Sequence, residues 1–330
     1  TEMKRAQVEG LPDFPLFTAK TATDVSYIAN ARKLLDHAPR IYPQFATHNA
    51  HSVAAILEMA KGADFEFQRL HGMGERLHDL VLAQQGTRCR IYAPVGAHRD
   101  LLAYLVRRLL ENGANSSFVN QIVDDEITPA EIAADPFAAP ALAPKALRAP
   151  HALYGESRRN STGFDLSDEG TLGQIAATRD AAPQGAAPLL HLRENIPGGA
   201  GGWPPAATPE PVTNPATGAP IANVTPANPA TVEAAIAAAQ PWTAPAAERA
   251  QTLRTAADLY EANSGPIFGL LAREAGKTLN DAVAELREAV DFLRYYAAEG
   301  EADSRAPRGR IAAISPWNFP LAIFTGQIAA

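Results

Sequence analysis

Short apolar runs alternate with helical patterns four times between residues 14 and 112. Runs rich in β-branched and aromatic residues predict strands at 14–18, 41–47, 65–70 and 89–93. Apolar positions at helical spacing predict helices at 23–37, 50–61, 75–84 and 99–111. We expect Thr23 and Asp24 to cap the first helix and Asn112-Gly113 to end the last. This alternation is typical of a parallel α/β sheet, either doubly wound or closed as a (β/α)₈ barrel.

Residues 125–209 differ in composition, because Ala, Pro and Gly crowd together there. This composition predicts a connector with short helices near 129–134 and 171–178. The glycine-rich run at 197–202 is not expected to bind phosphate, since no strand precedes it and prolines follow it.

The last region begins with turn residues at 212–218 between two short predicted strands. Helices are predicted at 231–240, 248–261 and 267–296, the last interrupted at Gly276-Lys277. Residues 309–315 predict a further strand that leads into residues 316–320. The expected domains are therefore residues 1–124, a linker at 125–209, and residues 210–330.

Charge and cysteine content narrow the class of protein. The 330 residues carry 29 Lys and Arg against 36 Asp and Glu, a net charge of −7, which argues against a general nucleic-acid binder. The single cysteine, Cys89, excludes a disulfide framework within one chain and indicates a reducing compartment. No run approaches the roughly 20 apolar residues of a membrane helix. Because Thr1 is not an initiator Met and four βα units make half a barrel, we expect an internal stretch of a longer polypeptide.

Two adjacent arginines, Arg107 and Arg108, lie in the predicted helix at 99–111 opposite an apolar face. Glu111 follows at helical spacing and could orient either guanidinium. Such a fork suits recognition of a small carboxylate, because guanidinium offers planar bidentate contacts. A surface Arg–Glu pair is the alternative that spacing leaves open.

Polar residues follow each predicted strand, where α/β folds build their sites. They are Thr18 and Lys20, then Thr47-His48-Asn49, then His71, then Tyr92. The histidines have no accompanying Cys or acidic cluster, so no metal site is expected. Cys89 begins a predicted strand, and a buried packing thiol is favoured over a nucleophile. The amide of Asn318 could donate to a developing oxyanion, although Asn in a Pro-rich turn can also be structural.

Several of these motifs resemble known families. Residues 45–49, 92–96 and 104–118 resemble the proline dehydrogenase barrel of the bacterial proline utilization A family. Residues 214–218, 274–277 and 314–320 resemble the start of an aldehyde dehydrogenase, and residues 160–166 resemble the segment between the two in that family. The resemblance implies the C-terminal half of a (β/α)₈ barrel, a Pro/Gly/Ala-rich linker, and the N-terminal part of a Rossmann-like domain.

The resemblance implies two successive oxidations. With FAD, L-proline becomes 1-pyrroline-5-carboxylate, which opens with water, and glutamate semialdehyde is then oxidised to L-glutamate with NAD. The residues that would bind proline are Leu70, Tyr92, Arg107 and Arg108. Those that would contact FAD are Lys20, Thr47, His48, Asn49, Gln68, Glu111, Ser117 and Phe118. Asn318 matches the oxyanion amide, and Ile314, Ser315, Pro316 and Trp317 match the backbone that lines the NAD site.

Further expectations follow from the same resemblance. Ala19 stands where the family usually has a basic residue, so Lys20 alone would neutralise the flavin phosphates. The nucleophilic cysteine of the aldehyde dehydrogenase is expected after Ala330, and the first barrel strands before Thr1. A homo-oligomer in the cytoplasm, associated peripherally with a membrane whose quinone accepts electrons, is expected. A flavin enzyme with a non-catalytic aldehyde dehydrogenase module is the alternative, while no basic helix supports a DNA-binding regulator.

Overall fold

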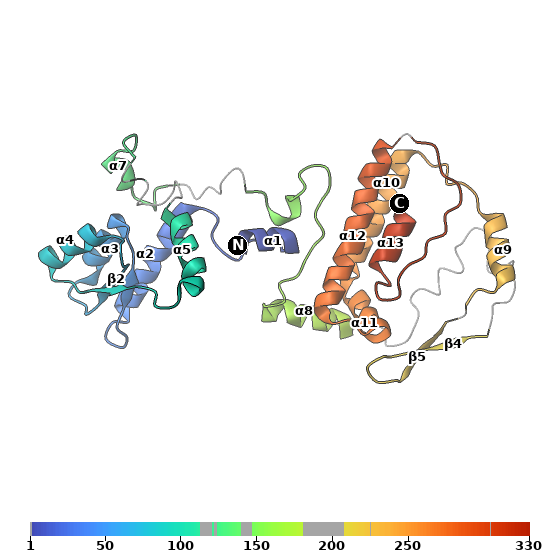
Figure 1. Cartoon of the computed structure of the whole chain (residues 1–330), viewed down its shortest axis with the longest axis horizontal. Coiled ribbons are helices and arrows are strands. Elements are labelled where there is room, and N and C mark those ends of the chain that lie inside the picture. Colours follow the sequence, from blue (N-terminus) through green and yellow to red (C-terminus); the bar gives the residue numbers. More distant parts are fainter. Residues whose placement is uncertain are drawn as a thin grey trace. The chain divides into compact units, whose positions relative to one another are not determined.

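The computed structural model describes residues 2–112, 121, 124–139, 147–180, 208–224, 226–303 and 305–330. They form two compact units (Figure 1), of which one comprises Leu16–Leu147 and the other comprises Thr1–Pro15 together with Arg148–Ala330. No helix among the described residues has the length and apolar character that crossing a membrane requires.

The Leu16–Leu147 unit contains a parallel sheet of three strands in the order β1-β2-β3. The strands are β1 (Gln44–Ala46), β2 (Glu66–Leu70) and β3 (Cys89–Tyr92). Phe67 pairs with Phe45 on one side and with Cys89 on the other. The strand predicted at 14–18 is wrong, because this stretch is a loop in which Pro15 has no N–H to donate and Leu16 and Phe17 are exposed.

Helices follow the three strands as the spacing predicts: α3 (Ala50–Ala60), α4 (Glu75–Gln85) and α5 (His98–Asn112). Helix α2 (Lys20–Asp36) precedes β1. Helices α2, α3 and α4 pack on one face of the sheet and bury Phe45, Phe67, Val53 and Ile56. The predicted capping by Thr23 and Asp24 is wrong, since α2 begins three residues earlier and Asp24 instead forms an ion pair with Lys20.

In helix α5 the apolar pattern does not predict which residues are buried. The residues expected to form its buried face, Leu102, Leu105, Val106 and Leu109, are all exposed in the described structure, at 41% to 72%. The short helix α7 (Pro129–Ile132) belongs to the same unit and begins at a capping box between Thr128 and Glu131.

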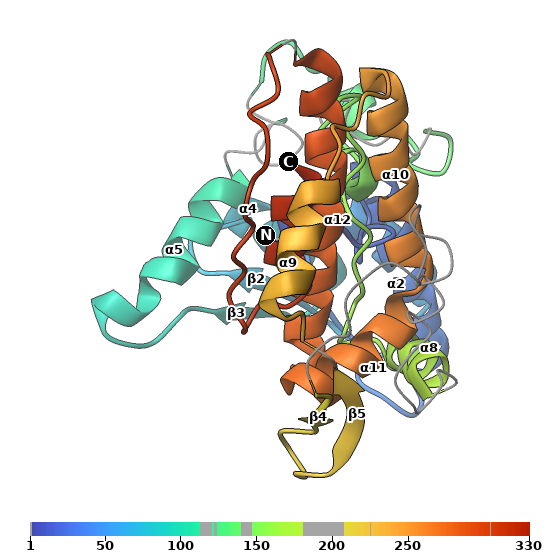
Figure 2. The same cartoon turned by 90° about the vertical axis from the view of Figure 1, so that its right-hand side faces the viewer.

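In the other unit, the helices α10 (Ala246–Ala262) and α12 (Leu279–Ala302) run alongside one another, as both views show (Figure 2). Gly276, in the left-handed conformation at φ 66°, ends α11 (Ser264–Ala275), and Thr278 caps α12. The predicted interruption at Gly276-Lys277 is confirmed. The apolar core between these helices includes Ala257, Phe268, Leu271, Leu286 and Val290.

Smaller elements complete this unit. They are α1 (Glu2–Glu9), the 3₁₀ turn η1 (Pro150–Ala152), α8 (Glu169–Asp180), the antiparallel strands β4 (Glu210–Thr213) and β5 (Pro220–Val224), α9 (Pro229–Ala238) and α13 (Ala322–Ala329). The strand predicted at 309–315 is wrong, because the structure gives this segment no ladder and leaves Ile311 and Ile314 exposed.

Candidate active-site segments

The sheet of the Leu16–Leu147 unit has a polar face opposite its helices. Since side chains alternate along a strand, Glu66, Gln68 and Leu70 share the face that Phe67 does not. The guanidinium of Arg90 on β3 donates to both carboxylate oxygens of Glu66, at 2.5 and 3.0 Å, and Gln44 on β1 donates to Oε1 at 2.8 Å. The hydrogen bonds from Arg90 hold the pKa of Glu66 below its usual value. The face is therefore polar and charge-paired rather than apolar.

Two histidines make contacts at the carboxyl ends of the strands: His48 joins the end of β1 to β2, and His78 joins α4 to the end of β1. The backbone N–H of Leu70 donates to Nε2 of His48 at 3.2 Å, which makes that nitrogen an acceptor and places the proton of a neutral ring on Nδ1. Nε2 of the buried His78 lies 2.9 Å from the carbonyl oxygen of Thr47, which can only accept, so His78 carries its proton on Nε2. A Cβ at Gly74 would stand 2.9 Å from the His48 ring, so only glycine leaves room for it there.

Asn49, which was expected to contact a cofactor, also caps a helix. Its side-chain oxygen accepts from the backbone N–H groups of His51 and Ser52, at 2.9 and 3.3 Å, and so caps α3. Thr47 Oγ1 accepts from the N–H of Asn49 at 3.1 Å, which fixes the entry to the helix. The amide nitrogen is therefore the atom that Asn49 can offer to a ligand.

The residues expected to bind substrate lie on two neighbouring strands and on α5. Leu70 pairs with Tyr92 across β2 and β3, with Leu70 buried and Tyr92 exposed at 44%. On α5, Arg107 is exposed, and the guanidinium carbon of the half-buried Arg108 lies 5.4 Å from the centre of the Tyr104 ring. Glu111 lies in α5, but its side chain, like Ser117 and Phe118, lies outside the described residues.

The donor set at these strand ends suits a flavin. The side-chain amides of Gln68 and Asn49 can hydrogen-bond polar groups of such a cofactor, and Leu70 is buried beside them. Next to them, Gly72 has a positive φ of 80°, and no atom lies within 4 Å of a Cβ built there, so the backbone is open to a ligand. Lys20 is exposed and is held by Asp24 at the start of α2.

Two further kinds of site were considered from the sequence, a nucleophilic cysteine and a metal site. Cys89 is half-buried against the core of the sheet, and burial raises the pKa of its thiol, which disfavours the nucleophilic thiolate. Among the described residues, no group of three or more His, Cys, Asp and Glu side chains could hold a metal ion.

The segment at 314–319 presents a tight turn in the other unit. The N–H of Phe319 donates to the carbonyl of Pro316 at 3.4 Å, which places Asn318 third in the four-residue turn, where it is exposed. The hydroxyl of Ser315 donates to Gln327 Oε1 at 2.8 Å. The Gln327 amide in turn donates to the Ile314 carbonyl at 3.0 Å.

This geometry fits the chemistry expected for a nicotinamide cofactor and an oxyanion. Asn318 presents an amide that can donate to an oxygen outside the turn. Ile314 and Trp317, exposed at 85% and 87%, offer apolar surface beside it.

Two charged residues near this turn, Lys277 and Glu285, form a contact that was not expected from the sequence. Glu285 on α12 is buried, and its carboxylate contacts Lys277 and the backbone at Leu321. The signal that could have revealed it is spacing, because Glu285 lies among the apolar positions Ala282, Leu286 and Ala289 of one helix face.

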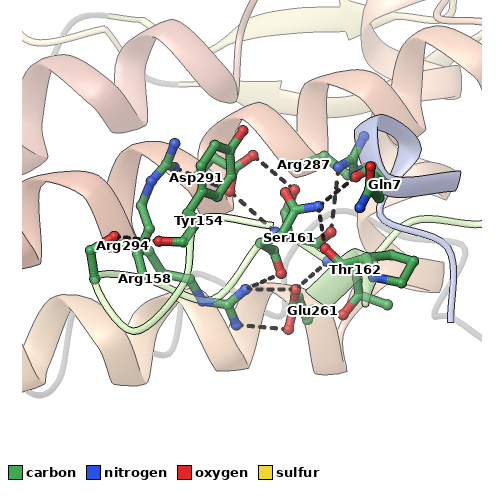
Figure 3. A network of polar contacts seen from close by, with 12 residues as sticks. Gln7, Tyr154, Arg158, Ser161, Thr162, Glu261, Arg287, Asp291 and Arg294 are labelled. Atoms are coloured by element: carbon green, nitrogen blue, oxygen red, sulfur yellow. Dashed lines mark hydrogen bonds and ion pairs between the residues drawn. The ribbon is translucent and has the colours of Figure 1, made fainter. Parts of the chain in front are cut away.

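The connector segment at 160–163 lies in a polar network with α10 and α12 (Figure 3). Ser161 donates its hydroxyl to Asp291 at 2.9 Å, and the N–H of Thr162 donates to Glu261 at 2.7 Å. Buried Asn160 donates to the carbonyl oxygen of Gln7 at 2.9 Å and thereby ties α1 to the same network. A stretch expected to be linker is thus packed and hydrogen-bonded.

Known sequences and structures resemble this chain over nearly its whole length. The proline dehydrogenase family matches residues 1–121, and the aldehyde dehydrogenase family matches residues 203–330. The bifunctional protein PutA of Escherichia coli is 46% identical over 100% of this chain and 27% of its own length. The PutA of Rhizobium meliloti is 45% identical over 100% of this chain and 28% of its own length. The chain thus spans about a quarter of the length of these curated relatives.

Solved structures agree with the sequence matches. A crystal structure of bifunctional proline utilization A superimposes with a TM-score of 0.81 at 43% identity, over 99% of this chain and 33% of that one. A proline utilization A from Bdellovibrio bacteriovorus, inactivated by N-propargylglycine, has a TM-score of 0.78 at 27% identity, over 99% of this chain and 36% of that one.

Proposed function

The chain belongs to the bifunctional PutA family, and from this premise we propose that it takes part in a two-step oxidation of L-proline to L-glutamate. In the first step proline becomes 1-pyrroline-5-carboxylate, and in the second the ring-opened glutamate semialdehyde becomes glutamate. FAD, and then NAD, would accept the electrons of these two steps. One observation carries the proposal above the others: proline dehydrogenase and aldehyde dehydrogenase matches occur on one chain, in the order of PutA.

In the proline half, the guanidinium groups of Arg107 and Arg108 bind the substrate carboxylate, because planar donors give bidentate contacts. Leu70 and Tyr92, paired across two strands, shape the pocket for the apolar ring. The residues proposed to hold FAD are Lys20, Thr47, His48, Asn49, Gln68, Glu111, Ser117 and Phe118. Two positions support this assignment: Thr47 to Asn49 directly follow β1, and Gln68 lies in the adjacent strand β2, where its carbonyl accepts from the Thr47 N–H.

In the aldehyde half, Asn318 is the residue of this chain proposed to act in catalysis. When a nucleophile adds to the aldehyde carbon, its oxygen gains negative charge, and the Asn318 amide donates to it. The backbone of Ile314, Ser315, Pro316 and Trp317 would line the NAD site. The exposed turn that presents Asn318 supports this role.

The wider assignments belong to the same proposal. We assign residues 1–124 to the C-terminal half of the barrel, 125–209 to the linker and 210–330 to the start of the NAD-binding domain. The protein would be a cytoplasmic homo-oligomer that associates peripherally with a membrane, where a quinone accepts the flavin electrons.

A single-function flavin enzyme with a non-catalytic aldehyde dehydrogenase module is the competing function. The experiment that separates the two supplies the full-length protein with glutamate semialdehyde and NAD and follows NADH. Formation of NADH supports the bifunctional enzyme. Proline oxidation without NADH formation from the semialdehyde contradicts it and favours the single-function alternative.

A further inference from the structure

A buried carboxylate on α12 is joined to the segment that follows Asn318. Glu285 is 1% exposed, and its Oε1 accepts from the backbone N–H of Leu321 at 2.8 Å and from that of Ala322 at 3.4 Å. Its Oε2 lies 3.0 Å from the ammonium nitrogen of Lys277. A buried carboxylate is costly unless it is paired, so these contacts account for its presence in the apolar face of α12.

Glu285 supplies the cap that α13 lacks from its own sequence. Leu321 occupies the N-cap position of α13 and has no side-chain oxygen with which to accept from the first N–H groups. The Glu285 carboxylate accepts at that position from another helix, and its negative charge also suits a helix N-terminus. The start of α13 is therefore fixed relative to α12.

Lys277 holds the other side of the same turn. Its ammonium nitrogen lies 4.3 Å from the centre of the Phe319 ring, within the range of a cation–π contact. Phe319 directly follows Asn318 and closes the turn through its N–H bond to Pro316. One ion pair thus contacts Phe319 through its cation and Leu321 through its anion, and Asn318 is the residue next to this anchored stretch.

We propose that Lys277 and Glu285 are positioning residues that hold the Asn318 turn in the orientation used for aldehyde oxidation. This inference rests on the proposed oxyanion role of Asn318. Neither side chain needs to touch the substrate, because Lys277 acts through Phe319 and Glu285 acts through the start of α13. Their removal should lower kcat for the semialdehyde more than it raises KM, since a small misplacement of a catalytic group slows chemistry.

A double-mutant cycle in the full-length protein tests this dependence. Glu285→Gln keeps the size and one acceptor oxygen but removes the charge that pairs with Lys277, and we expect kcat to fall by about 10-fold. In an Asn318→Ala background the same change should have little further effect, because the group being positioned is gone. Lys277→Met should lower kcat about as much as Glu285→Gln does. Lys277→Arg, which keeps the positive charge, should retain most of the native kcat. Glu299→Gln, at an exposed carboxylate farther along α12, is the control and should leave kcat unchanged.

Hydrogen exchange gives a readout that does not depend on activity. In Glu285→Gln, the peptide spanning residues 316–322 should exchange faster, while α10 keeps its protection and so shows that the fold is retained. An equal effect of Glu285→Gln with and without Asn318 overturns the positioning role, as does unchanged exchange at 316–322. A full rate for Asn318→Ala instead overturns the proposed oxyanion role, and with it the purpose of the positioning, even where exchange at 316–322 has increased.

Discussion

Arg294 and Glu261 form a two-armed ion pair between α12 and α10. Nη1 of Arg294 lies 3.0 Å from Oε1 of Glu261, and Nη2 lies 2.9 Å from Oε2 (Figure 3). The same guanidinium donates to the carbonyl of Asn160 at 3.3 Å, so the pair also holds the connector. Such a pair fixes geometry more than it adds stability, because both charges must leave water.

Removal of one partner should therefore be costly. Arg294→Met leaves the Glu261 carboxylate without its main partner. We expect the free energy of unfolding to fall by about 3 kcal/mol, the low end of the cost of breaking a buried pair, because Glu261 is 16% exposed. Urea denaturation followed by circular dichroism measures this loss. Arg254→Met, which breaks the exposed pair with Glu301, is the control and should change stability by less than about 1 kcal/mol. Equal losses of unfolding free energy in Arg294→Met and Arg254→Met would contradict the prediction that the buried pair matters more than the exposed one.

The stability that Glu261 contributes should depend on pH. Burial alone would raise the pKa of Glu261, but hydrogen bonds from Arg294 and from the Thr162 N–H, with the Arg294 charge, lower it below its usual value of 4.5. The unfolded chain then binds the proton more readily, so this stability is present above pH 4.5 and is lost as the pH falls through the lowered pKa. The difference in unfolding free energy between the native protein and Glu261→Gln should shrink between pH 6 and pH 3.5. A difference that grows on acidification would contradict the sign.

Gly163 should tolerate no side chain, because the chain of α1 passes directly over it. A Cβ there would stand 1.7 Å from the carbonyl oxygen of Glu9, and the Gly163 N–H donates to the Gly10 carbonyl at 2.7 Å. We expect Gly163→Ala to destabilise by at least about 1–3 kcal/mol, the usual cost of overpacking. Gly173→Ala in α8 is the matched control: a Cβ there meets nothing within 4 Å, and alanine should stabilise the helix by up to about 1 kcal/mol. Thermal unfolding compares the two, and similar shifts would refute the close approach.

The proposed carboxylate clamp makes a kinetic prediction. Arg108→Met keeps the length of the side chain but removes its donors, and the apparent KM for proline should rise by about 10-fold or more, as loss of a charge-assisted hydrogen bond implies. The visible spectrum of bound flavin should persist. Arg99→Met removes an exposed guanidinium near the start of the same helix and should leave the KM unchanged. Unchanged proline kinetics in Arg108→Met would refute the clamp.

The regular elements could be predicted because local spacing determines them. The helices α3 and α4 begin at the predicted residues, since Asn49 caps α3 and the Phe65 to Leu70 run stops at the glycines that precede α4. The strands at 14–18 and 309–315 could not be excluded from their composition, because a strand also needs a partner with free N–H and C=O groups. Apolar content alone does not supply that partner.

In the candidate site, too, some features could be predicted from the sequence and others could not. Residues that follow strands, such as Thr47 and His71, could be placed together because parallel strands align their carboxyl ends. Contacts between distant segments could not: His48 with Leu70, and Glu285 with Leu321, join residues 22 and 36 positions apart. No local pattern encodes such pairs, although the acidic residue in the apolar stripe of α12 is a signal of one.

We have proposed that this chain forms part of an enzyme that passes electrons from L-proline to a bound flavin. The most direct measurement is an anaerobic titration of the purified full-length protein with L-proline, followed by its visible spectrum. We expect a flavin absorbance that bleaches on addition of proline, with a much weaker response in Arg108→Met at the same proline concentration. A protein without flavin absorbance, or one whose flavin stays oxidised at saturating proline, would contradict it.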